Sequence, residues 1–169
     1  NGFWNCPIQD ANETIALSGQ NKGIRFAVVP KTPAYEPQET CPGKWMLSIP
    51  NNAPIFSATA YHFAQMLYNT LNVPVGIIVC SWGGSRVESW TSREILETYP
   101  DIDLTQKGIE TEQEWKRPLL MYNGMLKPLS NFTLKGFIWY QGESNVGKHD
   151  VYARRFATMV ELWRKDWKN

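Results

Sequence analysis

Residues 75–85, VGIIVCSWGGS, join a continuously apolar run to a turn that contains two adjacent glycines. The run Val75–Cys80 has no polar residue, as expected of a strand that is covered on both faces in a parallel sheet. We therefore predict a central strand here. Sites in parallel α/β sheets form at the carboxyl ends of strands, so the turn that follows is a candidate site.

Two further segments predict strands. Ile24–Val29 (IRFAVV) is rich in β-branched and aromatic residues and is stopped by Pro30. Leu134–Tyr140 (LKGFIWY) is the third predicted strand. A proline-rich loop is expected over residues 31–54, between the first two strands.

Helices are predicted where apolar residues recur every three or four positions. One helix ends near Asn72, and a short helix spans Ser92–Tyr99 with Ser92 as its cap. Thr111–Met125 is expected to be mostly helical, with an interruption at Pro118. The apolar faces are formed by Phe56, Ala60, Phe63, Ala64, Leu67 and Leu71 in the first helix and by Tyr152, Phe156, Met159, Val160, Trp163 and Trp167 in the last.

The predicted elements alternate as strand, helix, strand, helix, strand, helix. This order favours a three-layer α/β fold with a mostly parallel sheet and right-handed crossovers. A chain of this length buries roughly 70% of the surface that it exposes when unfolded. No repeat or second domain is apparent, so residues 1–169 are predicted to form one domain.

Charge and hydropathy exclude several classes of function. The 17 basic and 16 acidic residues leave a formal charge of +1. This charge is too small to indicate binding to nucleic acid or to an anionic membrane. No apolar run approaches the length of about 18 residues that a membrane-spanning helix needs. No cluster of His, Cys, Asp and Glu has metal-ligand spacing, so neither metal nor other cofactor is expected.

The two turns that follow predicted strands carry the chemistry. Gly83 and Gly84 would let bare backbone N–H groups approach a ligand, as an oxyanion hole requires. The second turn, residues 141–145 (QGESN), gathers two amides, a carboxylate and a hydroxyl, and amides can donate to an oxyanion without changing charge. The alternatives are a turn that only redirects the chain and a polar loop in which Glu143 or Asn145 caps the next helix.

Three segments resemble the sialate O-acetylesterase family of the SGNH hydrolases. They are residues 74–92 (PVGIIVCSWGGSRVESWTS), 120–129 (LMYNGMLKPL) and 137–145 (FIWYQGESN), and the likeness extends to residues 1–13 and 163–167. The resemblance implies a flavodoxin-like α/β/α domain that removes O-acetyl groups from sugars. It also implies a serine nucleophile, an oxyanion hole and an Asp–His pair.

The resemblance assigns roles to the residues of both turns. One backbone N–H of the glycine pair should contact the oxyanion, and we favour Gly84 over Gly83. Gln141 is the first choice for the side-chain donor and Asn145 the second. The candidates to line or support the substrate site are Trp82, which adjoins the glycine pair, Glu143, which more plausibly buttresses its turn, and Asn123, which either lines the site or fixes neighbouring loops.

Both ends of the family's catalytic apparatus are absent from the 169 residues. The Gly-Gln-Ser-Asn-Met turn of the nucleophile is expected upstream of residue 1, and the Asp-x-x-His pair beyond residue 169. Residues 18–21 (SGQN) are interpreted as a loop. The alternatives within the chain fit poorly, because Ser85 and Ser144 lack the second glycine of a nucleophile elbow and His62 and His149 lack an Asp three residues ahead.

The sequence therefore predicts the major part of a secreted or periplasmic carbohydrate O-acetylesterase that acts on acetylated sialic acid or a plant glycan. The chain alone is expected to be inactive. The alternative is a non-catalytic carbohydrate-binding or scaffold domain that keeps the fold. A Cys6–Cys41 disulfide and two free thiols both remain open, and the sequence predicts no oligomeric state.

Overall fold

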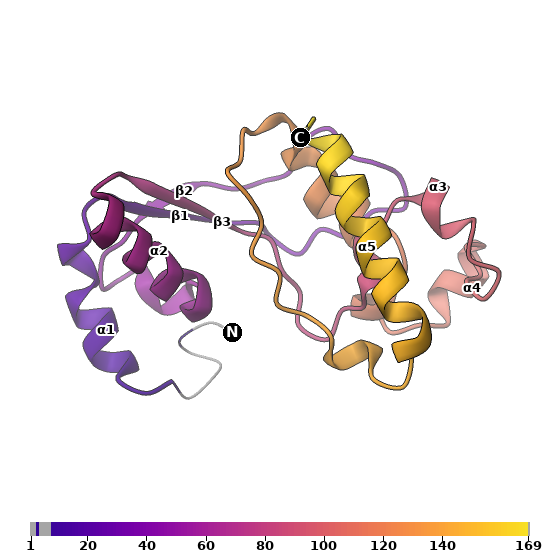
Figure 1. Cartoon of the computed structure of the whole chain (residues 1–169), viewed down its shortest axis with the longest axis horizontal. Coiled ribbons are helices and arrows are strands. Elements are labelled where there is room, and N and C mark those ends of the chain that lie inside the picture. Colours follow the sequence, from indigo (N-terminus) through magenta and orange to yellow (C-terminus); the bar gives the residue numbers. More distant parts are fainter. Residues whose placement is uncertain (1–2, 4–7, 169) are drawn as a thin grey trace. The chain divides into compact units, whose positions relative to one another are not determined.

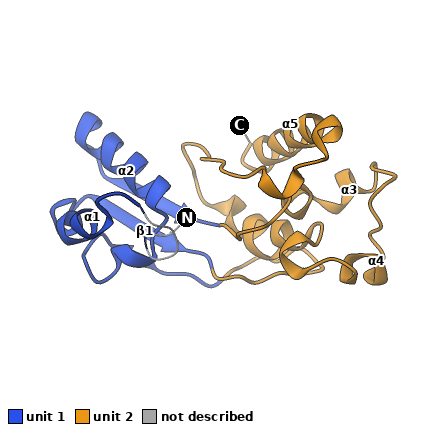
Figure 2. Cartoon of the chain, turned by 90° about the horizontal axis from the view of Figure 1, so that it is seen from below, with its two compact units in different colours: residues 1–29, 42–80 blue, residues 30–41, 81–169 orange. Residues whose placement is uncertain are grey.

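The computed structural model describes Phe3 and residues 8–168 (Figure 1). The chain forms two compact units, coloured separately in Figure 2. Unit 1 comprises residues 1–29 and 42–80, and unit 2 comprises residues 30–41 and 81–169. Cys6 lies outside the described residues, so its pairing with Cys41 stays a prediction.

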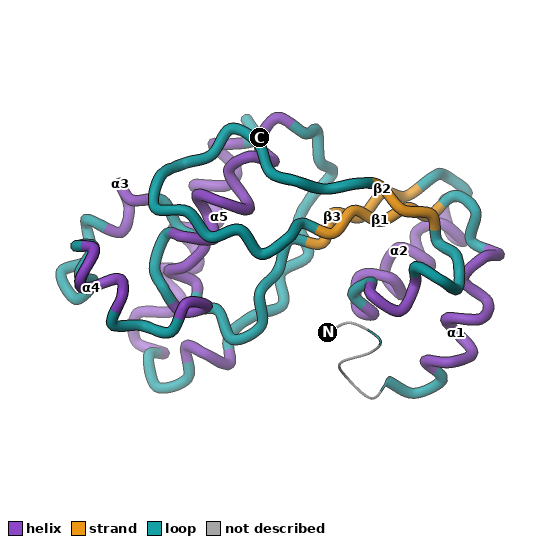
Figure 3. The backbone as a smooth tube through the Cα atoms, turned by 180° about the vertical axis from the view of Figure 1, so that it is seen from behind, coloured by secondary structure: helices purple, strands orange, loops and turns teal. Residues whose placement is uncertain are grey.

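Unit 1 contains a three-stranded mixed sheet in the order β2-β1-β3 (Figure 3). β1 (Ile24–Val28) pairs in parallel with β3 (Val75–Val79) and antiparallel with β2 (Trp45–Leu47). The strands predicted at residues 24–29 and 75–80 are confirmed. β2 was missed within the proline-rich segment, because a three-residue strand forms only when a neighbouring strand supplies its hydrogen bonds.

The prediction that Val75–Cys80 is a central strand covered on both faces is wrong among the described residues. β3 lies at the edge of the sheet, and its residues are half-buried except Gly76, which is exposed. A continuous apolar run specifies an extended segment that avoids water, but it does not specify how many neighbours the segment has.

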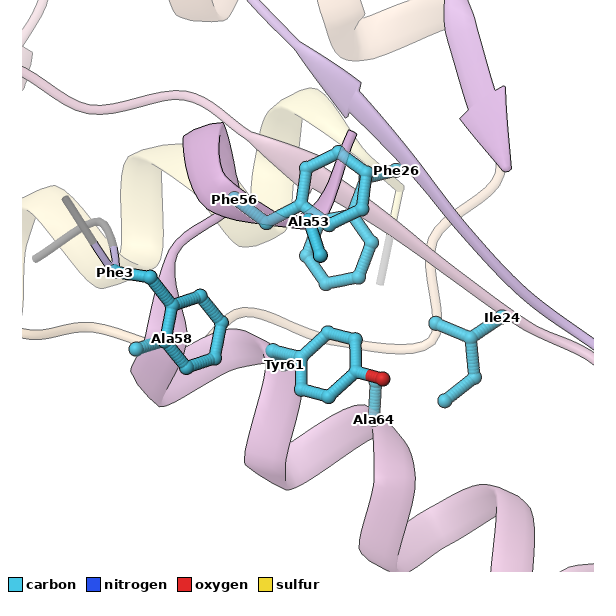
Figure 4. Packing of buried hydrophobic residues seen from close by; sticks show 8 residues of the cluster. All are labelled: Phe3, Ile24, Phe26, Ala53, Phe56, Ala58, Tyr61 and Ala64. Atoms are coloured by element: carbon cyan, nitrogen blue, oxygen red, sulfur yellow. The ribbon is translucent and has the colours of Figure 1, made fainter. Parts of the chain in front are cut away.

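The core of unit 1 lies between the sheet and α2 (Ala58–Leu71). The rings of Phe26 and Phe56 stack with centroids 4.1 Å apart, and Tyr61 packs beside them (Figure 4). Ser57 caps α2 by accepting a hydrogen bond from the Ala60 N–H, and Asn72 ends it in the left-handed conformation. The predicted helix is confirmed.

The predicted apolar face of α2 is only partly correct. Ala58, Tyr61 and Ala64 are buried, whereas Phe63 is 45% exposed and Leu71 58% exposed. Tyr61 turns inward because its hydroxyl has a buried partner, the Asn21 amide at 2.8 Å. α1 (Ala11–Leu17) and the 3₁₀ turn Ser18–Gln20 were also not predicted, and the latter occupies the expected loop.

Unit 2 is built from helices and irregular segments. The helix predicted from Ser92 is α3 (Arg93–Leu96), and the predicted terminal helix is α5 (His149–Asp166). The expectation of a mostly helical segment at 111–125 is confirmed in part. The chain breaks at Pro118 as predicted, with a 3₁₀ turn (Glu114–Lys116) before it and the start of a π-helical turn (Tyr122–Leu126) after it, in place of a long α-helix. α4 (Gln106–Glu110) precedes the segment. Other short helical turns among the described residues are Ala53–Ile55, Val87–Trp90, Lys127–Asn131 and Glu143–Asn145.

Residues 134–140, predicted as a strand, form no β-ladder with any described residue. Phe137 is 44% exposed, and its ring contacts Trp163 and Trp167 of the α5 region at centroid distances of 5.0 Å. Trp139 likewise contacts Trp163. The side chains therefore pack on a helix while the backbone lacks the partner strand that a ladder requires.

Met159 and Trp163 of α5 are buried, in agreement with the predicted face, and so is Arg155. Tyr122 and Lys127 both contact the Asp166 carboxylate at 2.6 Å, which holds the end of α5. Burial and the Asp166 hydrogen bond raise the pKa of Tyr122 far above its ordinary value. Within residues 8–168, no helix combines the length and the apolarity that would be needed to cross a membrane.

Candidate active site

The glycine turn, residues 81–85, is exposed at Gly83 and Gly84 and is closed by a hydrogen bond from the Ser85 N–H to the Trp82 carbonyl, 3.3 Å. Gly84 has a φ of +83°, and a Cβ at this position would lie 2.8 Å from Cδ1 of Trp115. A Cβ on Gly83 would meet nothing within 4 Å. Within residues 8–168, no acceptor is found for the N–H of Gly83 or Gly84, so both groups are available to a ligand.

Ser85 ends the turn as a buried structural residue. Its side-chain oxygen accepts a hydrogen bond from Nε1 of Trp90 at 2.9 Å, and its carbonyl accepts one from Nε2 of Gln141 at 2.9 Å. Only 5% of Ser85 is exposed. These contacts agree with the view that Ser85 is not a nucleophile.

The second turn, residues 141–145, is joined to the first by side-chain amides. Nε2 of Gln141 donates to the Ser85 carbonyl and, at 2.7 Å, to Oδ1 of Asn145. The Val87 N–H also donates to Oδ1 of Asn145, at 3.1 Å. The structure therefore brings the two turns together within unit 2. An amide nitrogen carries two hydrogens, so these acceptors engage the whole donor capacity of Gln141.

A buried pair of opposite charges lies behind Asn145. Nδ2 of Asn145 donates to Oε2 of Glu88 at 3.0 Å, and NH1 of Arg155 donates to Oε1 of Glu88 at 2.8 Å. Glu88 is 5% exposed and Arg155 2% exposed. Arg155 also bonds to Asp101, and this hydrogen bond lowers the pKa of the Asp101 carboxyl.

The sequence analysis missed Glu88 and Arg155, although a signal for Arg155 was present. Arg155 falls on the apolar face of α5, three residues after Tyr152 and four before Met159. A charge on an apolar helix face indicates a buried partner. Glu88 has no comparable signal, because its stretch also holds the polar residues Arg86 and Ser89.

The other candidate residues differ in their surroundings. Trp82 is half-buried, with Nζ of Lys31 5.2 Å from its ring centroid, and Glu143 is exposed. Asn123 is buried. Its side-chain amide donates to the Tyr35 carbonyl at 2.8 Å, and its backbone carbonyl accepts a hydrogen bond from the Gln38 N–H. Of the two roles considered for Asn123, these bonds favour fixing a neighbouring loop.

The other residues considered as an internal nucleophile or base lie at the surface or in a turn. Ser144 is half-buried in its turn, and His149 is exposed at the start of α5. His62 is exposed on α2, and its ring lies 6.1 Å from the ring of Tyr61. In the part of the chain that the structure describes, no group of three or more His, Cys, Asp or Glu side chains could hold a metal ion.

Comparison with known proteins identifies the family. The family model described as carbohydrate esterase, sialic acid-specific acetylesterase matches residues 50–169. The chain belongs to this family. The matched residues include both turns of the site, Asn123, Glu88 and Arg155.

Individual members of the sialic acid-specific acetylesterase family are similar over much of the chain. The sialate O-acetylesterase of Homo sapiens is 36% identical over 110 residues, which cover 64% of this chain. The rat enzyme, from Rattus norvegicus, is 32% identical over 142 residues, 68% of this chain. A carbohydrate acetylesterase from Xanthomonas citri has a crystal structure with a TM-score of 0.81 and 33% identity over 95% of this chain.

The chain spans only part of these family members. It covers 21% of the human relative, 26% of the rat relative and 34% of the bacterial structure. The family and the α/β class of the fold are thus established for this chain.

Proposed function

We propose that the chain forms the oxyanion-stabilising part of a carbohydrate O-acetylesterase. The observation that carries the proposal is the contact between the two turns, in which Nε2 of Gln141 lies 2.9 Å from the Ser85 carbonyl. This contact holds the amide turn beside the exposed N–H groups of Gly83 and Gly84. The relatives named as sialate O-acetylesterases and as a carbohydrate acetylesterase suggest the reaction and the class of substrate.

In the proposed reaction, a serine oxygen attacks the carbonyl carbon of an O-acetyl group while a histidine takes the serine proton. The carbonyl oxygen becomes negative, and the sugar hydroxyl leaves with that proton, after which water releases acetate from the acyl-enzyme. We place this serine, the histidine and its aspartate outside the 169 residues. The role of the chain is to stabilise the negative oxygen.

We assign the main hydrogen bond to the backbone N–H of Gly84, with Gly83 as the neighbouring donor. Neither group has an acceptor among residues 8–168, so an oxyanion can bind without displacing a protein partner. An oxyanion that also binds Gln141 has to replace either the Ser85 carbonyl or Oδ1 of Asn145. The same reasoning ranks Asn145 below Gln141, since its amide is buried in contact with Glu88.

The wider architecture belongs to the same proposal. We propose that residues 1–169 are part of one three-layer, flavodoxin-like SGNH domain with a mostly parallel sheet. The TM-score of 0.81 to the bacterial acetylesterase supports this assignment. We also propose a secreted or periplasmic location and a substrate that is an acetylated sialic acid or plant glycan.

The proposal is tested by assaying an acetylated chromogenic ester with the 169-residue chain and with a longer protein that adds the proposed serine and Asp–His blocks. The chain alone should be inactive. The longer protein should turn over the ester, should be blocked by a serine-directed inhibitor, and should release acetate from an O-acetylated sugar.

Two results would overturn the proposal. Turnover by the 169-residue chain that stops on Ser144→Ala or Ser85→Ala would place the nucleophile inside the chain. A longer protein that binds acetylated glycans but releases no acetate would establish the alternative, a carbohydrate-binding domain.

A further inference from the structure

The buried pair of Glu88 and Arg155 requires an explanation, because removing two charges from water costs several kcal/mol per ion unless their hydrogen bonds are satisfied. Both carboxylate oxygens of Glu88 have partners, Oε1 with Arg155 and Oε2 with the Asn145 amide. Arg155 in turn reaches Asp101 and lies 4.8 Å from the Tyr99 ring centroid. The pair is therefore built into unit 2 with definite directions.

The direction of each hydrogen bond follows from the charge of Glu88. A carboxylate accepts only, so Asn145 must turn its NH₂ group toward Glu88. Its Oδ1 then faces the Val87 N–H and Nε2 of Gln141, which are 3.1 and 2.7 Å away. The charge thus determines which end of the Asn145 amide meets Gln141.

The orientation continues into the glycine turn. Because one hydrogen of the Gln141 amide is held by Asn145, the other points to the Ser85 carbonyl. Ser85 is the residue whose N–H closes the turn on Trp82. An unbroken series of hydrogen bonds therefore leads from Arg155 on α5 to the turn that contains Gly83 and Gly84.

We propose that Glu88 and Arg155 are positioning residues, which orient Asn145 and Gln141 and so hold the glycine turn in the conformation that receives the oxyanion. The effect of this positioning on catalysis rests on the proposed function, the hydrolysis of O-acetyl esters. A pair that only stabilised the fold could be replaced by any side chains that fill the same space. The proposed role requires in addition that each donor and each acceptor along the network keeps its present direction.

A polarity swap provides the test. In E88Q, the residue at 88 has one acceptor and one donor and cannot serve both Arg155 and the Asn145 NH₂ group. In N145D, two carboxylates face each other at hydrogen-bond distance. In the double variant E88Q/N145D, the Gln amide donates to the new carboxylate and its oxygen still accepts from Arg155. The acceptor for Val87 and Gln141 is then restored with the net charge unchanged.

The first readout is made on the 169-residue chain and does not depend on activity. Amide hydrogen exchange of the Val87 N–H should accelerate on the order of tenfold or more in each single variant and return close to the wild-type rate in the double variant. E112Q is the matched control, since it makes the same chemical change in the half-exposed pair with Arg86. It should leave Val87 exchange unchanged.

The second readout is the ester assay in the longer protein described above. Each single variant should lower kcat about 10-fold to 100-fold while KM changes by less than about threefold, as expected when only the transition state loses its donors. The double variant should recover kcat to within about threefold of wild type, and E112Q should match wild type.

The outcomes separate this inference from the proposed function. If the wild-type longer protein has no activity, the proposed function fails, and the exchange data still decide whether the polarity of the network is as described. If wild type is active but single variants retain kcat, or the double variant recovers neither exchange nor kcat, the inference is wrong. If a single variant does not fold, recovery of a folded chain with Val87 protected in the double variant supports the inference, and failure to fold contradicts it.

Discussion

Units 1 and 2 bury their polar groups in different ways. Unit 1 packs aromatic rings between a sheet and a helix. Among its described residues, the charged side chains lie at the surface. Unit 2 buries Glu88 and Arg155 together with the amide of Asn145. The apolar cluster of unit 2 contains Leu96, Ile109 and Tyr99, and Arg155 of the polar network lies over the Tyr99 ring.

The difference explains why the candidate site belongs to unit 2. Apolar contacts are non-directional, so a core such as that of unit 1 specifies volume more than orientation. Hydrogen bonds between buried groups specify which atom faces which, at the cost of desolvation. A site that must aim N–H groups at a developing charge needs the second kind of order.

The largest effect is expected in unit 1, from Phe26→Ala. Phe26 is fully buried and stacks on Phe56, so its removal should lower the free energy of unfolding by about 3–5 kcal/mol. Phe63→Ala, an identical change at a side chain that is 45% exposed, should cost less than about 1 kcal/mol. Urea titrations compare the two variants, and equal losses would contradict the proposed core.

A smaller effect is expected in the glycine turn. Gly84→Ala should lower the free energy of unfolding by about 1–2 kcal/mol, because the positive φ disfavours an L-residue and the new methyl group would press on Trp115. Gly83→Ala is the matched control, since its Cβ would enter open space. It should leave the free energy of unfolding unchanged or slightly higher. A Gly83→Ala loss as large as that of Gly84→Ala would contradict the turn geometry.

The smallest effect concerns the outer partner of Arg155. The hydrogen bond from Arg155 lowers the pKa of Asp101 below its ordinary 3.8, so this contact stabilises the fold above that pH and is lost as the pH falls through the lowered value. Because the Asp101 side chain is 53% exposed, we expect Asp101→Asn to cost less than about 1 kcal/mol at pH 7.

Denaturant titrations at pH 7 and in strong acid measure the Asp101 contribution. The difference between wild type and Asp101→Asn should shrink in acid, and a difference that grew there would have the wrong sign. Glu161→Gln, in an exposed pair with Arg164, should differ from wild type by less than about 0.5 kcal/mol at pH 7.

Sequence patterns predicted the elements whose formation depends on neighbouring residues. The strands at Ile24 and Val75 and the helices that follow Phe56 and precede Trp167 were found from local periodicity and stop signals. Leu134–Tyr140 was not predicted correctly, because β-propensity describes how side chains fit a sheet and cannot supply the partner strand. At Thr111–Met125 the break at Pro118 was predicted, but the kind of helical turn was not. Leu119 adopts a positive φ there and donates its N–H to the Glu88 carbonyl, a distant contact that local sequence does not encode.

The sequence by itself determined the family, the two candidate turns and the residue types that could stabilise an oxyanion, because these depend on local order and chemistry. Only the tertiary structure decided that the turns meet through Gln141 and Ser85 and that Glu88 and Arg155 stand behind them. Those contacts join residues 56 to 67 positions apart. Local patterns do not encode such pairings, because a buried charge is stable only where the fold delivers its partner.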